Sequence, residues 1–127
     1  MLLDNSKEEG HDMADTNIRK HISLEAAKTV ENPKGIFRTT LAFEDKAMLC
    51  HFVMKKGAEI PLHHHEAVQI GYVVSGTVKF RKESGESFTA GPQTSYAFET
   101  NEAHGAQVLA DAEVIECFSP MRPEYAD

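Results

Sequence analysis

The sequence predicts an all-β fold, a sandwich or barrel of short strands, from three observations. Short apolar runs rich in β-branched and aromatic residues recur along the chain. Glycine, proline and charged residues that favour turns separate these runs. The chain has 127 residues, a length that suits one domain with a single core. We therefore expect one domain over residues 16–127, preceded by a polar tail at residues 1–15 that lacks hydrophobic periodicity.

The first predicted element is a helix-like stretch, Leu24–Val30, in which helix-forming residues follow Ser23, a residue type that caps helix N-termini. Every later element is expected to be a strand, because each run is short, mostly apolar and bounded by turn residues. The predicted strands are residues 35–43, 47–54, 68–74, 77–81, 95–98, 104–109 and 113–118. A tight turn at Ser75–Gly76 is expected to separate two of them.

Three consecutive histidines, the first of them His63, are the strongest chemical signal in the chain. Alternate side chains of an extended strand share a face, so His63, His65 and Gln69, which are all odd-numbered, can converge. His104 lies far enough along the chain to arrive on a neighbouring strand. Three imidazoles and one amide oxygen suit a divalent transition metal, with nickel or zinc favoured and iron or manganese as alternatives.

Two alternatives concern the fourth ligand. Gln69 can instead form hydrogen bonds inside the barrel while three histidines hold the metal, since amides are weak ligands. Glu66 is a rival ligand, but it has the wrong parity unless a β-bulge intervenes. If Gln69 does bind, the ligand set is neutral and leaves the full 2+ charge on the metal. Such a site is a strong Lewis acid and attracts anions.

The spacing of these residues resembles a known family. From Gly57 the chain reads GAEIPLHHHEAVQIGYVVSG, which resembles the first cupin motif, G-x5-H-x-H-x3-E-x6-G, with Gln69 in place of the usual Glu. The second cupin motif is matched in part: Asn101 precedes His104 by three residues, where the motif has Gly, and Asn also adopts left-handed turns. The resemblance implies a single-domain cupin, which is a double-stranded β-helix or jelly-roll barrel, and it implies a homodimer.

The C-terminal run VIECFSPMR, taken with Gln69 and His104, is similar to the small KdgF cupins of pectin degradation. That family uses His, His, Gln and His for its metal and linearises 4,5-unsaturated uronates to keto-deoxyuronates. The resemblance implies that Glu116, Phe118 and Arg122 line the substrate pocket. The family has Asp where this chain has the longer Glu116.

These residues imply an isomerising, metal-dependent enzyme that acts on a small acidic sugar or a similar anionic molecule. Glu116 is the candidate proton-transfer group, Arg122 the candidate carboxylate-binding group and Phe118 a pocket wall. Their structural alternatives are a surface carboxylate, a solvated cation and a core ring. Two other functions stay open. An Fe(II)-dependent dioxygenase is disfavoured because it would lack the usual carboxylate ligand, and a non-catalytic metal or sugar-acid sensor would bind without turnover.

The composition of the chain argues against two classes of partner, nucleic acids and membranes. The formal net charge is −7, and lysines and arginines are scattered, which argues against a nucleic-acid partner. No apolar run has membrane-spanning length and no signal peptide is visible, so we expect a cytoplasmic protein without a membrane partner. Cys50 and Cys117 lie in apolar runs, and we expect both to be buried thiols rather than a disulfide.

Overall fold

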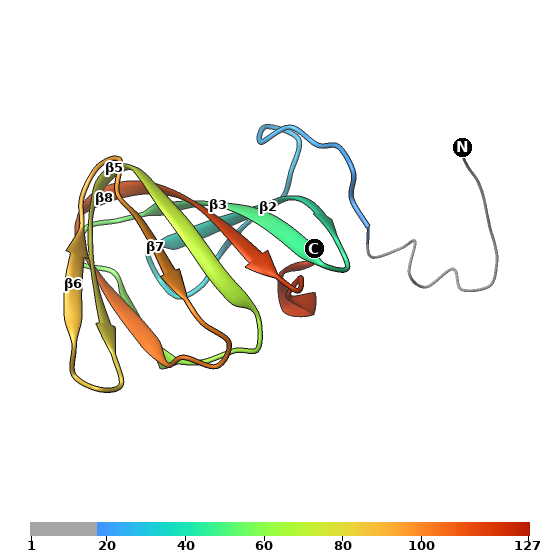
Figure 1. The fold of residues 1–127 in the computed structure, drawn as a ribbon. Helices are drawn as coiled ribbons and strands as arrows, with labels where there is room; N and C mark the ends of the chain where they lie inside the picture. Colours follow the sequence, from blue (N-terminus) through green and yellow to red (C-terminus); the bar gives the residue numbers. More distant parts are fainter. Residues whose placement is uncertain (1–17) are drawn as a thin grey trace.

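The structure is a computed structural model that describes residues 18–127 (Figure 1). The predicted tail at residues 1–15 lies outside the described part. Within that part the chain forms strands and one short 3-10 helix, so the all-β prediction is confirmed. In chain order the elements are β1 (Thr29–Glu31), β2 (Ile36–Glu44), β3 (Ala47–Met54), β4 (Glu59–His63), β5 (Val68–Lys82), β6 (Ser87–Ala90), β7 (Ser95–Phe98), β8 (His104–Ser119) and η1 (Pro123–Tyr125). Among the described residues, no helix has the length and apolar character needed to cross a membrane.

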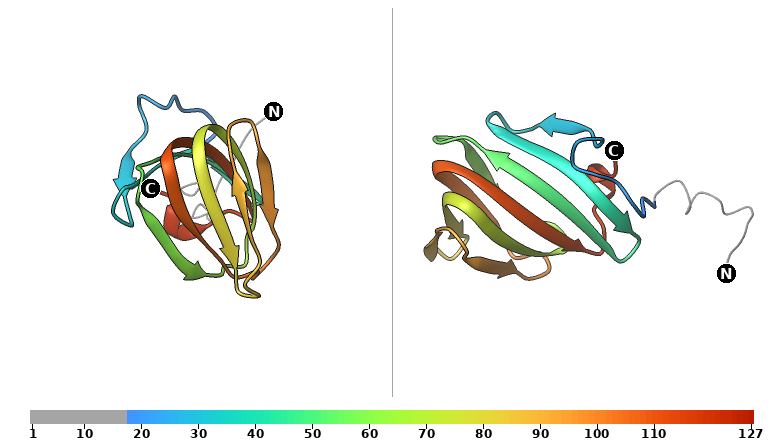
Figure 2. Two further views of the ribbon diagram at one scale, coloured as in Figure 1. Left: turned by 90° about the vertical axis from the view of Figure 1, so that its left-hand side faces the viewer. Right: turned by 90° about the horizontal axis from the view of Figure 1, so that it is seen from above.

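The two longest strands, β5 and β8, organise the fold. They pair with each other over almost their whole length, from Val68 opposite Ser119 to Lys82 opposite His104. On its other edge β8 pairs first with β4 and then with β3, while β5 pairs first with β7 and then with β6. All pairings are antiparallel, and the strands curve around a common interior that the left view of Figure 2 shows end-on. This is the jelly-roll arrangement that the family resemblance implies.

The continuity of β5 corrects one prediction. No turn forms at Ser75–Gly76, because the strand passes through this point with register shifts against β8. Gly76 has φ 86°, and a Cβ at this position would lie 2.1 Å from the carbonyl oxygen of Asp111. The glycine therefore serves a β-bulge, which needs the same backbone freedom as a tight turn and gives the same sequence signal. The prediction of two separate strands at residues 104–109 and 113–118 is also wrong, because β8 runs without a break from His104 to Ser119.

The predicted helix-like stretch, Leu24–Val30, is also wrong. The chain makes a single turn there, in which the backbone amide of Ala26 donates to the Ser23 hydroxyl oxygen at 3.2 Å, and it then enters β1. Seven residues are too few to repay the cost of helix nucleation. Thr29 instead pairs with Thr39 of β2, and their hydroxyl oxygens are 2.6 Å apart.

Along the second half of β8, every second side chain points into the barrel interior. Val114, Glu116 and Phe118 are all buried, as expected for residues of one parity. The core around them is made of side chains from most of the other strands. Of the two free cysteines in the described part, Cys50 is buried as expected, but Cys117 is exposed because it has the opposite parity to Phe118.

The outer face of β3, β8 and β5 carries exposed apolar side chains. Leu49 and Ile70, which are 39% and 54% exposed, both lie opposite Cys117 in neighbouring ladders. Val53, Tyr72 and Val74 are also exposed on these strands. An exposed apolar face of this kind is typical of a surface that is buried when two protein chains associate. The homodimer implied by the family resemblance stays a prediction.

Candidate metal centre

Three imidazoles meet inside one end of the barrel. The ligand-capable nitrogens of His63, His65 and His104 all lie within 4.8 Å of one another. His63 is the last residue of β4 and pairs directly with His104, the first residue of β8, so the antiparallel register places the two rings 4.6 Å apart. His65 follows in the loop that leads to β5. Within the described residues, this cluster therefore meets the distance requirement for a divalent metal site.

Strand parity is only part of the reason why the predicted ligands lie close together. His63, His65 and Gln69 do not lie on one extended strand, because β4 ends at His63 and β5 begins only at Val68. A loop turns the chain between the two strands. The convergence therefore depends on strand pairing and on that loop as well as on alternation. Glu66, the rival ligand, is exposed in the same loop and is not part of the cluster.

Backbone carbonyls fix the orientation of all three rings. The Nδ1 atoms of His63, His65 and His104 lie 3.0, 2.8 and 2.8 Å from the carbonyl oxygens of Pro61, Ala67 and Glu102. A carbonyl oxygen only accepts, so each Nδ1 carries the hydrogen and each Nε2 presents a lone pair. This is the outer-sphere pattern typical of histidines that bind metals.

The contacts of the Gln69 side chain indicate whether a metal ion fits between this residue and the histidines. Its Oε1 atom lies 3.1 Å from Nε2 of His65 and 3.2 Å from Nε2 of His104. If these nitrogens carry lone pairs, as their Nδ1 contacts indicate, then three acceptor atoms face one another at close range. A cation among them removes that repulsion, and the neutral nitrogen and oxygen donors suit a divalent transition metal. The donor set therefore fits a divalent metal, and the role of Gln69 as fourth ligand stays a prediction.

Glu116 orients the amide of Gln69. The Gln69 amide nitrogen donates to a Glu116 carboxylate oxygen at 2.7 Å, which leaves the amide oxygen turned toward the histidines. The Tyr96 hydroxyl donates to the same carboxylate oxygen at 2.5 Å. Glu116 is 4% exposed, and burial raises its pKa, while these two hydrogen bonds and the charge of Arg122 act in the opposite direction. A buried carboxyl beside a metal site, with a raised pKa, is suited to proton transfer.

The contact between Tyr96 and Glu116 depends on Gly71, a residue that the sequence analysis did not identify. Gly71 pairs with both Glu116 and Tyr96 across its two ladders. A Cβ at Gly71 would lie 2.2 Å from Cζ of Tyr96, so only glycine leaves room for the phenol ring to cross β5 and reach Glu116. A glycine inside a strand is the available signal for such a close approach.

The predicted catalytic residues share one cavity with the predicted ligands. This cavity, of about 60 Å³, is lined by His63, Gln69, His104, Glu116, Phe118 and Arg122, together with Tyr125. It adjoins a wider opening of about 520 Å³ that is also lined by His63, Arg122 and Tyr125. A separate hollow of about 630 Å³ lies beside Lys34, Lys55 and Lys56 and is lined by none of the candidate residues. Every predicted site residue lines this cavity except His65, which belongs to the histidine cluster and lines a neighbouring hollow together with Arg122.

Arg122 lies at the junction of the cavity and the opening. Its guanidinium stacks on the rings of Phe118 and Tyr125, with centroid distances of 5.2 and 4.1 Å. Its Nε and Nη2 atoms donate to a carboxylate oxygen of Glu124 at 3.2 and 3.0 Å. The arginine is therefore not a freely solvated cation, and it already holds a carboxylate. Tyr125 was not predicted as a site residue, because an aromatic residue in a polar run near the chain's last residues carries no periodic signal.

Metal-depleted protein is expected to lose stability as the pH falls from about 6.5 toward 4. Burial lowers the pKa of His104 to about 4 and also lowers the pKa of His65. In this pH window the unfolded chain takes up protons at these histidines before the folded protein does, so acidification favours unfolding. Thermal midpoints measured after chelation at several pH values test this. The variant His104→Gln should show a shallower dependence between pH 6.5 and 5, and an equal slope in both proteins contradicts the assignment.

A family model and several solved structures both relate this chain to cupins. A family model described as a cupin domain matches residues 50–118. An RmlC-like cupin from Shewanella frigidimarina is 26% identical, with a TM-score of 0.79 over 86% of this chain and 98% of its own. KdgF from a Halomonas species is 30% identical, with a TM-score of 0.74 over 84% of this chain and 98% of its own. An oxalate decarboxylase from Bacillus subtilis has the same fold at 20% identity and a TM-score of 0.72, covering 86% of this chain and 32% of its own. A search of curated proteins finds no significant match.

Proposed function

We propose that this chain, which belongs to the cupin family, is a metal-dependent isomerase that linearises small unsaturated uronates to keto-deoxyuronates. The observation that carries the proposal is the contact from the buried Glu116 carboxylate through Gln69 to the histidines, with Arg122 lining the same cavity. The likeness to KdgF supports the choice of substrate class.

The metal would be held by His63, His65, Gln69 and His104, and we propose nickel or zinc ahead of iron or manganese. Once bound, it supplies a Lewis acid whose 2+ charge is not reduced by any ligand, and that charge favours an anionic, oxygen-rich substrate. Phe98 stacks on the His104 ring at 4.0 Å and keeps that ligand in one plane. Preorganisation of this kind reduces the cost of binding.

The remaining chemistry belongs to the side chains of the cavity. Arg122 binds the substrate carboxylate in place of Glu124, and Phe118 packs against the sugar ring. Glu116 accepts the proton of the anomeric hydroxyl as the bond between the anomeric carbon and the ring oxygen breaks, so that an aldehyde and an enolate form. Glu116 then gives the same proton to the alkene carbon next to the oxygen-bearing carbon, and the enolate becomes a ketone. No atom or electron is gained or lost, so the reaction is an isomerisation.

A turnover assay tests the function directly. Metal-loaded protein should remove the ultraviolet absorbance of the conjugated alkene in unsaturated galacturonate, with no oxygen consumed. Because Glu116 is longer than the Asp of the KdgF family, related unsaturated uronates belong in the same assay. Oxygen uptake that depends on substrate would favour the dioxygenase, and tight uronate binding without turnover would favour the sensor.

The variant Arg122→Ala is expected to bind uronates at least about 30-fold more weakly, since truncating a shielded charge-assisted contact costs about 2 kcal/mol or more. Metal content should not change, because Arg122 contacts none of the four predicted ligands through a hydrogen bond. Calorimetry with galacturonate measures the affinity. The control Arg81→Ala removes an exposed arginine outside the cavity and should bind normally. Equal affinity in Arg122→Ala and the wild type would remove Arg122 from substrate binding.

A further inference from the structure

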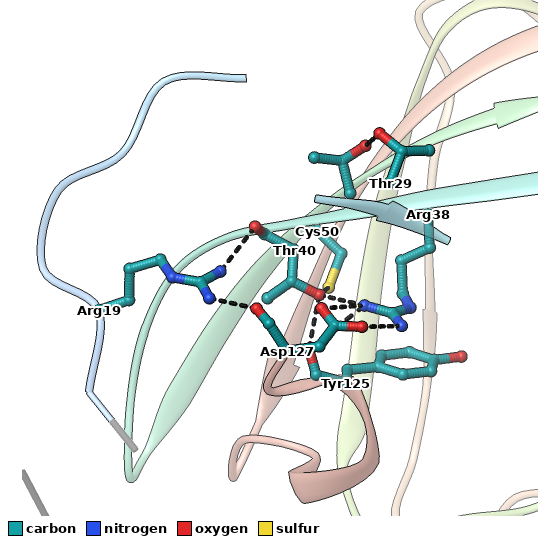
Figure 3. Close-up of polar contacts among 8 residues, drawn as sticks. Arg19, Thr29, Arg38, Thr40, Cys50, Tyr125 and Asp127 are labelled. Atoms are coloured by element: carbon teal, nitrogen blue, oxygen red, sulfur yellow. Dashed lines mark hydrogen bonds and ion pairs between the residues drawn. The ribbon is translucent and has the colours of Figure 1, made fainter. Parts of the chain in front are cut away.

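The segment that follows β8 is tied to strand β2 by polar contacts (Figure 3). The Nη2 and Nη1 atoms of Arg38 donate to the two carboxylate oxygens of Asp127 at 2.8 and 3.2 Å. The backbone carbonyl of Tyr125 accepts from the Thr40 hydroxyl at 2.7 Å and from Arg38 at 3.2 Å. Arg19 adds donations to the backbone carbonyls of Thr40 and Asp127. Two interior-facing polar residues of β2 therefore meet a segment whose helix η1 contains no buried residue.

Arg38 has features that a surface arginine would not show. It is only 6% exposed, yet no proposed catalytic step uses it. Its charge is matched by Asp127, whose pKa the guanidinium holds below its usual range. A buried arginine costs desolvation free energy that hydrogen bonds and an ion pair must offset. The sequence places it on a β-strand between the buried residues Ile36 and Thr40, where an apolar side chain would otherwise be expected.

The Tyr125 ring connects Arg38 to the candidate site. The Arg38 guanidinium lies 4.3 Å from the ring centroid, and the Arg122 guanidinium lies 4.1 Å from the same centroid. Both arginines thus use one aromatic ring as a platform, and the ring also packs edge-on against Phe118 at 5.5 Å. Cation–π contacts of this kind orient a guanidinium plane as well as stabilise it.

We infer that Arg38 is a positioning residue for Arg122: by holding Tyr125 and Asp127 against β2, it fixes the platform on which the anion-binding guanidinium rests. Arg38 itself lines only the wider opening and not the inner cavity with the predicted metal ligands. It acts through Tyr125, and it determines how well the site recognises a carboxylate rather than how fast a proton moves. This inference rests on the proposed role of Arg122 in substrate binding.

The variant Arg38→Lys tests the inference while it keeps a positive charge beside Asp127. Lysine lacks the planar fork that bonds to a carboxylate through two nitrogens and stacks on a ring. We expect metal content to be retained, KM for unsaturated uronate to rise about 5- to 20-fold and kcat to stay within about twofold, because the lost contact acts equally in the ground and transition states. Asp127→Asn, which keeps the size of the side chain, should move KM in the same direction. Arg81→Lys makes the same chemical change at an exposed position and should alter neither constant.

Two further measurements separate positioning from simple stabilisation. Calorimetry with saturated galacturonate, which has no alkene to isomerise, should show that Arg38→Lys weakens binding in the wild-type background but has no further effect in Arg122→Ala. Hydrogen exchange of amides in residues 121–127, measured without ligand, should be faster in Arg38→Lys. A lower thermal midpoint with unchanged KM, unchanged exchange or additive affinity losses would each overturn the inference. Galacturonate binding without any turnover defeats the proposed function alone, whereas the absence of any uronate binding by the wild type defeats both.

Discussion

Replacing Glu116 with Gln is expected to lower turnover of the unsaturated uronate by about 100- to 10,000-fold, the range for loss of a general acid–base residue. The substitution preserves size, and the new side-chain oxygen can still accept from Gln69 and from the Tyr96 hydroxyl. Fold, metal content and most of the ligand affinity should therefore survive. The group that is lost is the one that takes up and releases a proton in the buried cavity.

The control for this variant lies on the same strand. Glu113→Gln makes the identical change on the outer face of β8, where the carboxylate pairs with His51 at 2.8 Å and does not line the cavity. It should leave turnover unchanged. Alkene absorbance, followed in both variants together with metal analysis, gives the comparison. Full activity in Glu116→Gln would exclude this residue from proton transfer, and the mechanism would then need another base.

The second large effect is expected from His65→Ala, which should lose the metal. The wild type, purified without nickel resin, should contain close to one divalent ion per chain. Removal of one imidazole leaves two rings and a weak amide donor, too few for a stable site. Elemental analysis measures the change directly, and the thermal midpoint should no longer respond to added metal, because a ligand stabilises only the state that binds it.

His64→Ala is a closely matched control. His64 is the neighbour of His65, is exposed and does not belong to the three-histidine cluster. Its variant should retain full occupancy and the wild-type response to metal. Equal metal content in the two alanine variants would show that His65 is not a ligand. The assignment of the three-histidine cluster as a metal site would then be wrong.

The sequence alone determined the features that depend on local chemistry. Alternation of side chains on a strand placed Val114, Glu116 and Phe118 on one face, and all three are buried together. Asn101 has φ 59°, the left-handed conformation expected where the second cupin motif has glycine. The spacing of the histidines identified the cluster that His63, His65 and His104 form in space. The first two signals span few residues and need no knowledge of the partner strand, whereas the position of His104 beside His63 depends on the pairing of β4 with β8.

Tertiary structure alone decided how the site is supported. The glycine signal at Gly76 did not distinguish a turn from a bulge, because positive φ serves both and only pairing with β8 separates them. The Tyr96 contact to Glu116 depends on the register that places both opposite Gly71. The contact between Arg38 and Tyr125 joins residues that are 87 positions apart. Contacts at such separations are set by strand register and side-chain packing across the whole barrel, and those properties do not exist in any short stretch of the chain.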